Sequence, residues 1–174
     1  MLGNKSFITI FSQNIRSLNR NLDVFLCMFS HNTIPDVLIF SETWLALGDP
    51  VNIPGYTGFH TIRIGRSGGV SIFIKDSFLS EKIPELSFAN DSIEICTIKI
   101  QNSSNILYLC GIYRPHAGTI ENFCSSIESI LSNNILANKS CICDRNGKSY
   151  LKYRDVFYSN VHSCHPLFVW LTEW

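Results

Sequence analysis

Charged residues are scarce in this chain of 174 residues: Asp, Glu, Lys and Arg make up 16% of it, against about 25% in a typical globular domain. Acidic and basic residues balance, so the formal net charge at pH 7 is zero, and no quarter of the sequence is strongly basic. A broad basic surface for nucleic acid is therefore not expected. This argues against a passive DNA-binding module, but it counts less against an enzyme that meets phosphate through a metal ion.

Long apolar runs are absent as well. The longest uninterrupted one covers residues 24–29, far below the ~20 residues that a membrane span needs. The N-terminal apolar stretch is interrupted by polar residues 12–14, with no small-residue cleavage site after it, which argues against a signal peptide. The seven cysteines are an odd number, lie mostly within apolar runs, and so indicate free thiols and no disulfide framework. We expect an intracellular protein, nuclear or cytoplasmic, that is not secreted and does not enter a membrane.

What the chain does contain is apolar residues, 45% in all, including twelve Phe. This is enough for one domain with a substantial core. Residues 6–15 predict a buried strand, residues 18–32 an amphipathic helix and residues 36–40 a second buried strand. A strand–helix–strand unit of this length favours parallel pairing of the two strands with a right-handed crossover.

Further strands follow along the chain, in an alternating pattern typical of the middle of a sandwich. We predict them over residues 56–64, 70–75, 92–101 and 105–113, paired antiparallel in succession. Thr119 is placed to cap a helix over residues 120–131, and residues 140–143 predict one short strand more. Residues 148–174 show no clean period. The pattern as a whole predicts an α/β fold.

Polar residues of a few types close the predicted strands. They are Asn14, Glu42, Tyr113, Arg114, Asp144 and Asn146. In a layered α/β fold the ends of buried strands converge on one rim, where ligands bind. Carboxylate and amide oxygens there suit a hard divalent cation, and a phenol with a guanidinium suits a phosphate group.

Each of these residues also has an ordinary structural explanation. Glu42 and Arg114 fit solvated surface positions, and Asn14 fits a turn. Residues 145–148 also make an ordinary hairpin turn around their Asn-Gly pair. A zinc site at Cys141 and Cys143 with later Cys and His residues is a weaker alternative, because its spacing departs from that of structural zinc sites.

Together and in this order, the motifs resemble those of the endonuclease/exonuclease/phosphatase superfamily. The greatest similarity is to the N-terminal endonuclease domain of non-LTR (LINE-type) retrotransposon polyproteins. The matching text is Ser-Gln-Asn-Ile-Arg-Ser-Leu at 12–18, Leu-Ile-Phe-Ser-Glu-Thr-Trp-Leu at 38–45, Gly-Tyr at 55–56, Gly-Gly-Val at 68–70 and Gly-Ile-Tyr-Arg-Pro at 111–115. The resemblance covers residues 6–146.

This resemblance implies a four-layer α/β sandwich, with two mixed β-sheets face to face and helices outside. It implies hydrolysis of phosphodiesters, with DNA as partner and Mg²⁺ or Mn²⁺ as cofactor. The implied roles are Glu42 as principal metal ligand, Asn14 as a neighbouring ligand or a residue that orients the metal site, Tyr113 and Arg114 as phosphate contacts, Asp144 as the residue that orients the attacking water, and Asn146 as the group that stabilises the transition state.

Two departures from the family pattern count against activity. The family's late strand reads Gly-Asp-Phe-Asn, whereas residues 143–146 read Cys-Asp-Arg-Asn, and the family's closing Ser-Asp-His does not occur in this sequence. We therefore expect a family domain over residues 6–146 that is truncated or frame-shifted near residues 140–147. An atypical tail would follow over residues 147–174, and the second sheet would be incomplete, with an open edge.

Three functions stay open on the sequence. The first is a metal-dependent DNA endonuclease of retrotransposon type with impaired or absent catalysis. The second keeps the fold but acts on other phosphates, as a phosphatase or a phospholipid phosphodiesterase. The third is an inactive remnant or interaction module. The oligomeric state does not follow from the sequence.

Overall fold

The computed structural model describes residues 8–29, 35–65, 67–102, 105–133, 136, 141–143 and 167–172. The described elements, in chain order, are β1 (Ile10–Asn14), α1 (Leu18–Cys27), β2 (Val37–Ser41), β3 (Tyr56–Thr61), β4 (Val70–Lys75), β5 (Leu79–Lys82), the 3₁₀ turn η1 (Pro84–Leu86), β6 (Phe88–Ala89), β7 (Glu94–Asn102), β8 (Asn105–Tyr113), α2 (Ile120–Leu131), β9 (Cys141–Cys143) and β10 (Leu167–Thr172). Among these residues, neither helix has the length and apolar character to cross a membrane.

The strands form two sheets. The first has the order β1-β2-β4-β3, and the second has the order β5-β7-β8-β10-β9, with β6 also paired to β7. Strands β1 and β2 run parallel and are connected through α1, as predicted. The pairs β3–β4 and β7–β8 are antiparallel, as predicted for the middle of the chain. The predicted pairing of β4 with β7 is wrong: the two strands lie in different sheets, and β4 pairs antiparallel with β2 instead.

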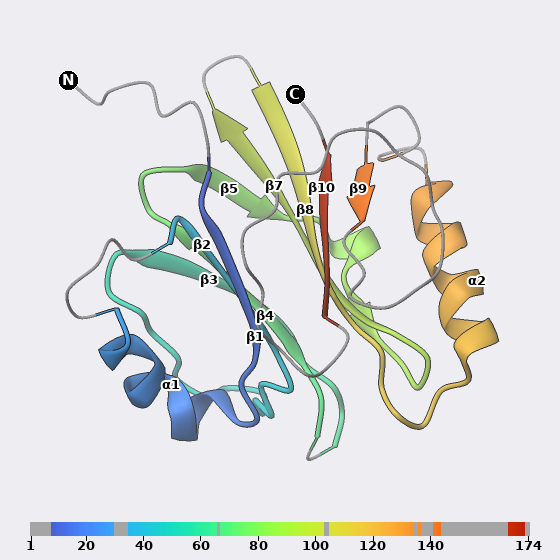
Figure 1. Ribbon diagram of the computed structural model, residues 1–174, viewed down its shortest axis with the longest axis horizontal. Coiled ribbons are helices and arrows are strands. Elements are labelled where there is room, and N and C mark those ends of the chain that lie inside the picture. The colour runs from blue at the N-terminus through green and yellow to red at the C-terminus, as the bar shows by residue number, and fades with distance from the viewer. Residues whose placement is uncertain are drawn as a thin grey trace.

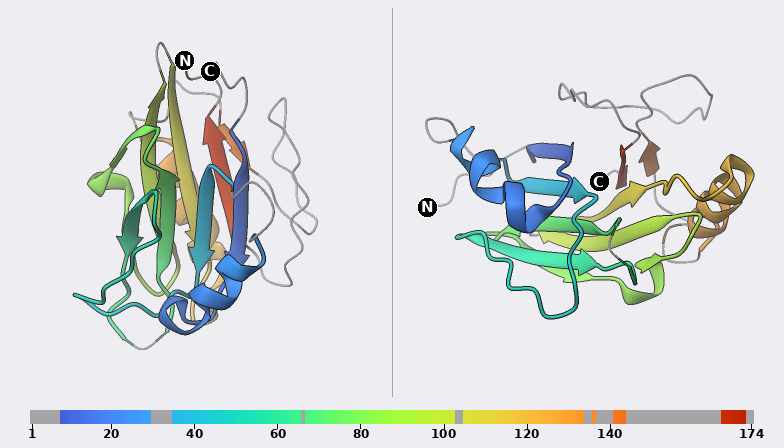
Figure 2. Two further views of the ribbon diagram at one scale, coloured as in Figure 1. Left: turned by 90° about the vertical axis from the view of Figure 1, so that its left-hand side faces the viewer. Right: turned by 90° about the horizontal axis from the view of Figure 1, so that it is seen from below.

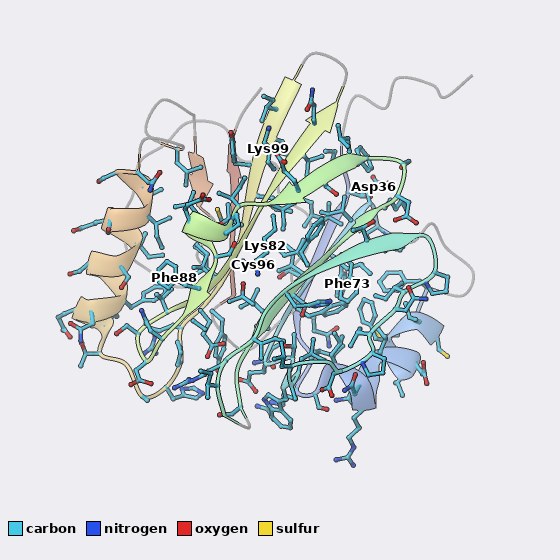
Figure 3. All side chains as sticks on the ribbon, turned by 180° about the vertical axis from the view of Figure 1, so that it is seen from behind. Asp36, Phe73, Lys82, Phe88, Cys96 and Lys99 are labelled. Carbon is cyan, nitrogen blue, oxygen red and sulfur yellow. The ribbon has the colours of Figure 1, made fainter. Side chains whose placement is uncertain are left out.

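The faces of the two sheets meet in an apolar core that follows the period of two along each strand. In β2, Val37 and Ile39 point into this core, whereas Leu38 and Phe40 point to the opposite face. The other residues of the core between the sheets are Val70, Ile72, Ile74, Cys96, Ile98, Ile100, Leu107, Leu109 and Tyr113. Figure 3 labels Cys96 near the centre of the molecule.

Each helix covers the outer face of one sheet. Phe25 of α1 packs edge-on against Phe40 of β2, with ring centroids 4.9 Å apart. On the other side, Phe123 and Ile127 of α2 pack in one cluster with Ile112 of β8. Figure 1 shows α1 and α2 on opposite sides of the strands, and Figure 2 shows the same arrangement from two further directions. The prediction of a four-layer α/β sandwich is confirmed. The first sheet is mixed, as expected, whereas every described pair of strands in the second sheet is antiparallel.

The two sheets approach each other closely at Gly111 of β8. A Cβ atom at this position would lie 2.9 Å from the Cγ2 atom of Ile39 and 3.1 Å from the Cγ1 atom of Val70. Glycine is therefore required for the close approach. Tyr113 lies two residues further along the same face of β8, so its side chain reaches across to the end of β2.

Three of the described strands were not predicted: β5, β6 and β10. We predicted no regular element after residue 147, yet Leu167–Thr172 forms β10, which pairs antiparallel with both β8 and β9. The predicted open edge is therefore wrong for β8. An isolated run of five apolar residues, here 167–171, has too little pattern to distinguish a strand from other buried structure. The pairing with β8 identifies this segment as a strand.

The start of α2 provides a test of a local prediction. The Thr119 side chain accepts a hydrogen bond from the Asn122 N–H at 3.3 Å, as expected of an N-cap. Thr119→Ala should lower the free energy of unfolding by about 1 kcal/mol, whereas Thr119→Ser, which keeps the oxygen, should change it little. Urea unfolding of both variants measures this. Equal losses in the two variants would contradict the cap.

Candidate functional site

Three of the residues predicted from strand ends meet at one carboxylate. Asn14 is the last residue of β1, Glu42 follows β2 directly, and Tyr113 is the last residue of β8. The Asn14 Nδ2 group and the Tyr113 hydroxyl both donate hydrogen bonds to Glu42 Oε1, each at 2.7 Å. The two sheets therefore share a polar cluster at one rim of the sandwich.

The backbone around Glu42 is held in an uncommon conformation. Four non-glycine residues among those described have a positive φ: Arg16, Ser17, Glu42 and Trp44. All four belong to the segments that follow β1 and β2. Left-handed backbone costs a non-glycine residue about 1 kcal/mol or more, and such strain concentrates at functional sites. The Ser17 N–H donates to the Glu42 carbonyl at 2.9 Å, which ties the two segments together.

A turn of two glycines before β4 supports the Glu42 segment from the other side. The Gly69 carbonyl accepts from the Thr43 N–H at 3.3 Å, and the Gly68 carbonyl accepts from the Trp44 N–H at 2.9 Å. Gly68 has φ 95°, and a Cβ atom on it would lie 2.3 Å from Glu94 Oε1. Only glycine fits this position. The glycine turn therefore packs directly against the buried carboxylate of Glu94, next to the site.

That carboxylate, Glu94, is fully buried. Its Oε2 atom accepts from the Gly69 N–H at 2.5 Å, and its Oε1 atom accepts from Arg63 Nη1 at 3.1 Å. The other end of the Arg63 guanidinium donates to Asp91 at 2.8 Å. Burial raises the pKa of Glu94 and the nearby Glu42 charge adds to the rise, while the Gly69 N–H and Arg63 act in the opposite direction.

Glu94 and Tyr113 are directly opposite each other in the β7–β8 register. Burial, followed by the hydrogen bond to Glu42, raises the pKa of Tyr113. The phenol therefore stays protonated at neutral pH and donates a hydrogen bond to an oxygen acceptor. Such a donor holds Glu42 in place and is also suited to a phosphate oxygen.

Beside this cluster lies an open cavity of about 460 Å³. Its lining residues are Arg16, Glu42, Trp44, Arg63, Ser67, Gly68, Tyr113, Pro115, His116 and Ala117. Glu42 is the one carboxylate among these described residues, and Arg16 Nε lies 4.0 Å from Glu42 Oε2. The cavity falls in the size range of small-molecule sites, and its wall offers a carboxylate, a phenol and guanidinium groups to a ligand.

The oxygen atoms at the rim fit a divalent cation. Glu42 supplies a carboxylate, and the buried Asn14 Oδ1 atom has no hydrogen-bond partner among the residues that the structure describes. Within the same residues, no three His, Cys, Asp or Glu side chains gather as a metal site. Mg²⁺ needs only one or two carboxylates and keeps several waters. The donor set thus suits Mg²⁺ or Mn²⁺ held by few protein ligands.

The remaining predicted site residues are placed differently. Arg114 Nη1 donates to the Gly118 carbonyl at 3.3 Å within the β8–α2 connection. Pro115 and His116, which follow it, line the cavity, whereas Arg114 does not. Asp144 and Asn146 lie outside the described residues. The side chains of Cys141 and Cys143, named in the zinc alternative, are also outside the description.

Sequence reasoning missed the Arg63–Glu94 pair, although one signal was available. In β7, Glu94 shares its face with Cys96, Ile98 and Ile100, which point into the core between the sheets. A carboxylate at an inward position of an alternating strand requires a partner in the interior. The partner itself, Arg63 in the β3–β4 connection, has no comparable signature.

Comparisons with known proteins support the fold. No family model matches the chain, and no curated protein matches it. Among solved structures, the chain is similar to D. rerio TDP2 in a crystal structure of that protein complexed with single strand DNA product. The TM-score is 0.52 and the identity 16%, over 97% of this chain and 84% of that chain. At this identity the similarity shows the fold alone, which is a four-layer α/β sandwich.

Proposed function

We propose that this domain is a metal-dependent phosphodiester hydrolase that acts on DNA, and more specifically an endonuclease of the type found in non-LTR retrotransposons. The observation that carries the proposal is the convergence of Asn14, Glu42 and Tyr113, from three strand ends, beside an open cavity. The fold shared with TDP2, whose structure contains single strand DNA product, supports DNA as the substrate class.

The residues divide the chemistry among them. Glu42 and Asn14 would hold Mg²⁺ or Mn²⁺, which when bound polarises the phosphoryl group and stabilises the leaving oxygen. Tyr113 keeps Glu42 oriented through its 2.7 Å hydrogen bond and is placed to donate to a phosphate oxygen. In the proposed reaction a water oxygen attacks phosphorus, and the bond from phosphorus to the leaving sugar oxygen breaks.

Three further residues take the roles that the family resemblance implies. Asp144 would orient the attacking water and accept its proton. Asn146 would donate a hydrogen bond to the phosphoryl oxygen as negative charge develops there. Arg114 would add a second phosphate contact once it leaves the Gly118 carbonyl.

Nicking of supercoiled plasmid by the purified, folded chain tests the proposal. We expect relaxed circles in the presence of Mg²⁺ and none in EDTA. A folded chain that leaves the plasmid intact with both Mg²⁺ and Mn²⁺ would contradict the proposal and leave a non-catalytic module. If plasmid nicking is weaker than hydrolysis of a phospholipid or a sugar phosphate, DNA is the wrong substrate class.

Tyr113→Phe tests the role of the phenol. The variant keeps the buried ring but loses the hydrogen bond to Glu42, which is a bond to a charged acceptor. We expect the nicking rate to fall about tenfold or more, since such bonds contribute about 1.5–3 kcal/mol. Tyr108→Phe on the same strand is a matched control, because Tyr108 does not line the cavity. An unchanged rate in Tyr113→Phe would exclude the phenol from the reaction.

A further inference from the structure

Trp44 is exposed beside the site although its neighbours in the chain are buried. Trp44 is 44% exposed, whereas Thr43 and Leu45 are 1% and 5% exposed. Its φ is 53°, a left-handed conformation that is costly for a bulky residue. The Gly68 carbonyl holds its N–H at 2.9 Å in this conformation. The backbone of Trp44 is therefore strained while its indole ring is exposed. Packing in the core does not explain this combination.

The surroundings of the indole indicate what it contacts. Trp44 lines the cavity together with Glu42 and Tyr113, so the ring and the proposed phosphate site share one space. Arg16 and Arg63 also line this cavity. A flat aromatic face beside cationic groups and a phosphate-binding rim matches a ligand that carries both a planar ring and an anionic backbone, which is the chemistry of a nucleotide.

We propose that Trp44 is a stacking platform for one unpaired nucleobase of the DNA strand whose phosphate is held at Glu42 and Tyr113. This inference rests on the proposed function and adds a substrate feature to it. A base presents its face to an indole only when it is free of its neighbours in a duplex. The preferred substrate is therefore DNA with a single-stranded or displaced nucleotide next to the phosphate to be cut.

Binding of a short fluorescein-labelled single strand, of about a dozen nucleotides, measures this directly by anisotropy. Ca²⁺ replaces Mg²⁺ throughout, so that a hard cation can occupy the rim while no cleavage is needed for the readout. Trp44→Asn removes the ring and keeps a residue that tolerates left-handed backbone. Trp44→Phe keeps a smaller ring. Leu47→Asn is the matched control, because Leu47 is 95% exposed in the same connection and does not line the cavity.

Trp44→Asn should bind the strand about tenfold more weakly than the wild type, while Trp44→Phe and Leu47→Asn should bind nearly as well. A strand made abasic along its length should bind the wild type about tenfold more weakly than the intact strand, and Trp44→Asn should not distinguish the two strands. Wild-type affinity in Trp44→Asn, or equal binding of both strands by the wild type, would overturn the inference.

The failure of this inference and the failure of the proposed function can be told apart. If the strand binds through Trp44 but is never cut when Mg²⁺ is added, the stacking platform stands and the hydrolase proposal fails. If plasmid is nicked and Trp44→Asn binds the single strand like the wild type, the hydrolase stands and the stacking platform fails.

Discussion

Glu42→Gln should reduce metal-dependent nicking by at least about 100-fold while the domain stays folded. The substitution keeps the length of the side chain and leaves an oxygen that still accepts from Asn14 and Tyr113, as Glu42 Oε1 does at 2.7 Å. It removes the negative charge that the divalent cation requires. We expect the free energy of unfolding without metal to change by less than about 1 kcal/mol, since the hydrogen bonds are retained.

A second readout separates metal binding from turnover. A ligand that binds only the folded state raises the unfolding temperature, and the rise grows with the logarithm of ligand concentration once the site is saturated. Mg²⁺ should therefore raise the unfolding temperature of the wild type and have no such effect on Glu42→Gln. Glu128→Gln, an exposed position on α2, is the matched control and should behave as the wild type in both assays. Persistent nicking by Glu42→Gln would remove this residue from the reaction.

Arg63→Ala should lower the free energy of unfolding by about 3 kcal/mol at pH 7, because it leaves a buried carboxylate without its cation. Glu94 is fully buried, and the Arg63 side chain is 22% exposed. Lys99→Ala is the matched control, since the Lys99–Glu81 pair has a shorter distance of 2.7 Å but side chains that are 25% and 62% exposed. We expect little change there, because exposed ion pairs contribute little to stability.

The loss in Arg63→Ala should depend on pH in a defined direction. Burial already raises the pKa of Glu94 above its ordinary value of 4.5, and Arg63 opposes the rise. Without Arg63 the folded state therefore holds the Glu94 proton to a higher pH than the unfolded state does. The variant's free energy of unfolding should fall as pH rises above about 4.5.

Urea unfolding of the wild type and of Arg63→Ala at several pH values measures this dependence. The difference between the two proteins should shrink as the pH is lowered toward 4.5, since a protonated Glu94 needs no cation. A difference that stays constant with pH would show that Arg63 acts through packing and not through its charge. Because Gly69 is tied to Glu94, Arg63→Ala should also impair nicking.

The layers of the fold followed from local pattern. Residues 37–40 form a continuous apolar run, and the resulting β2 is buried on both faces, as expected of a strand between a helix layer and a second sheet. The i, i+3, i+4 spacing in α1 and the cap at Thr119 depend only on neighbouring residues. These features require no knowledge of distant contacts, so the sequence was sufficient for them.

The candidate site could be predicted only in part. Asn14, Glu42 and Tyr113 each follow or end a strand. Because strand ends converge on one rim, the sequence was enough to predict that these three residues lie together. Arg114 shows the limit of that reasoning, because its neighbour Tyr113 faces the site while its own guanidinium bonds to Gly118. Alternation along a strand determines the face of a residue within it, but not the direction of a side chain beyond its end.

The sequence by itself determined the α/β layers, the parallel β1–β2 unit and the three residues at the rim, since local periodicity and the positions of strand ends encode all of these. Only the tertiary structure decided that Glu94 supports the rim from below through Gly69 and Arg63, that Trp44 faces the cavity, and that Leu167–Thr172 joins the second sheet. These contacts join segments far apart in the chain. Their geometry follows from how the two sheets pack, which no local pattern records.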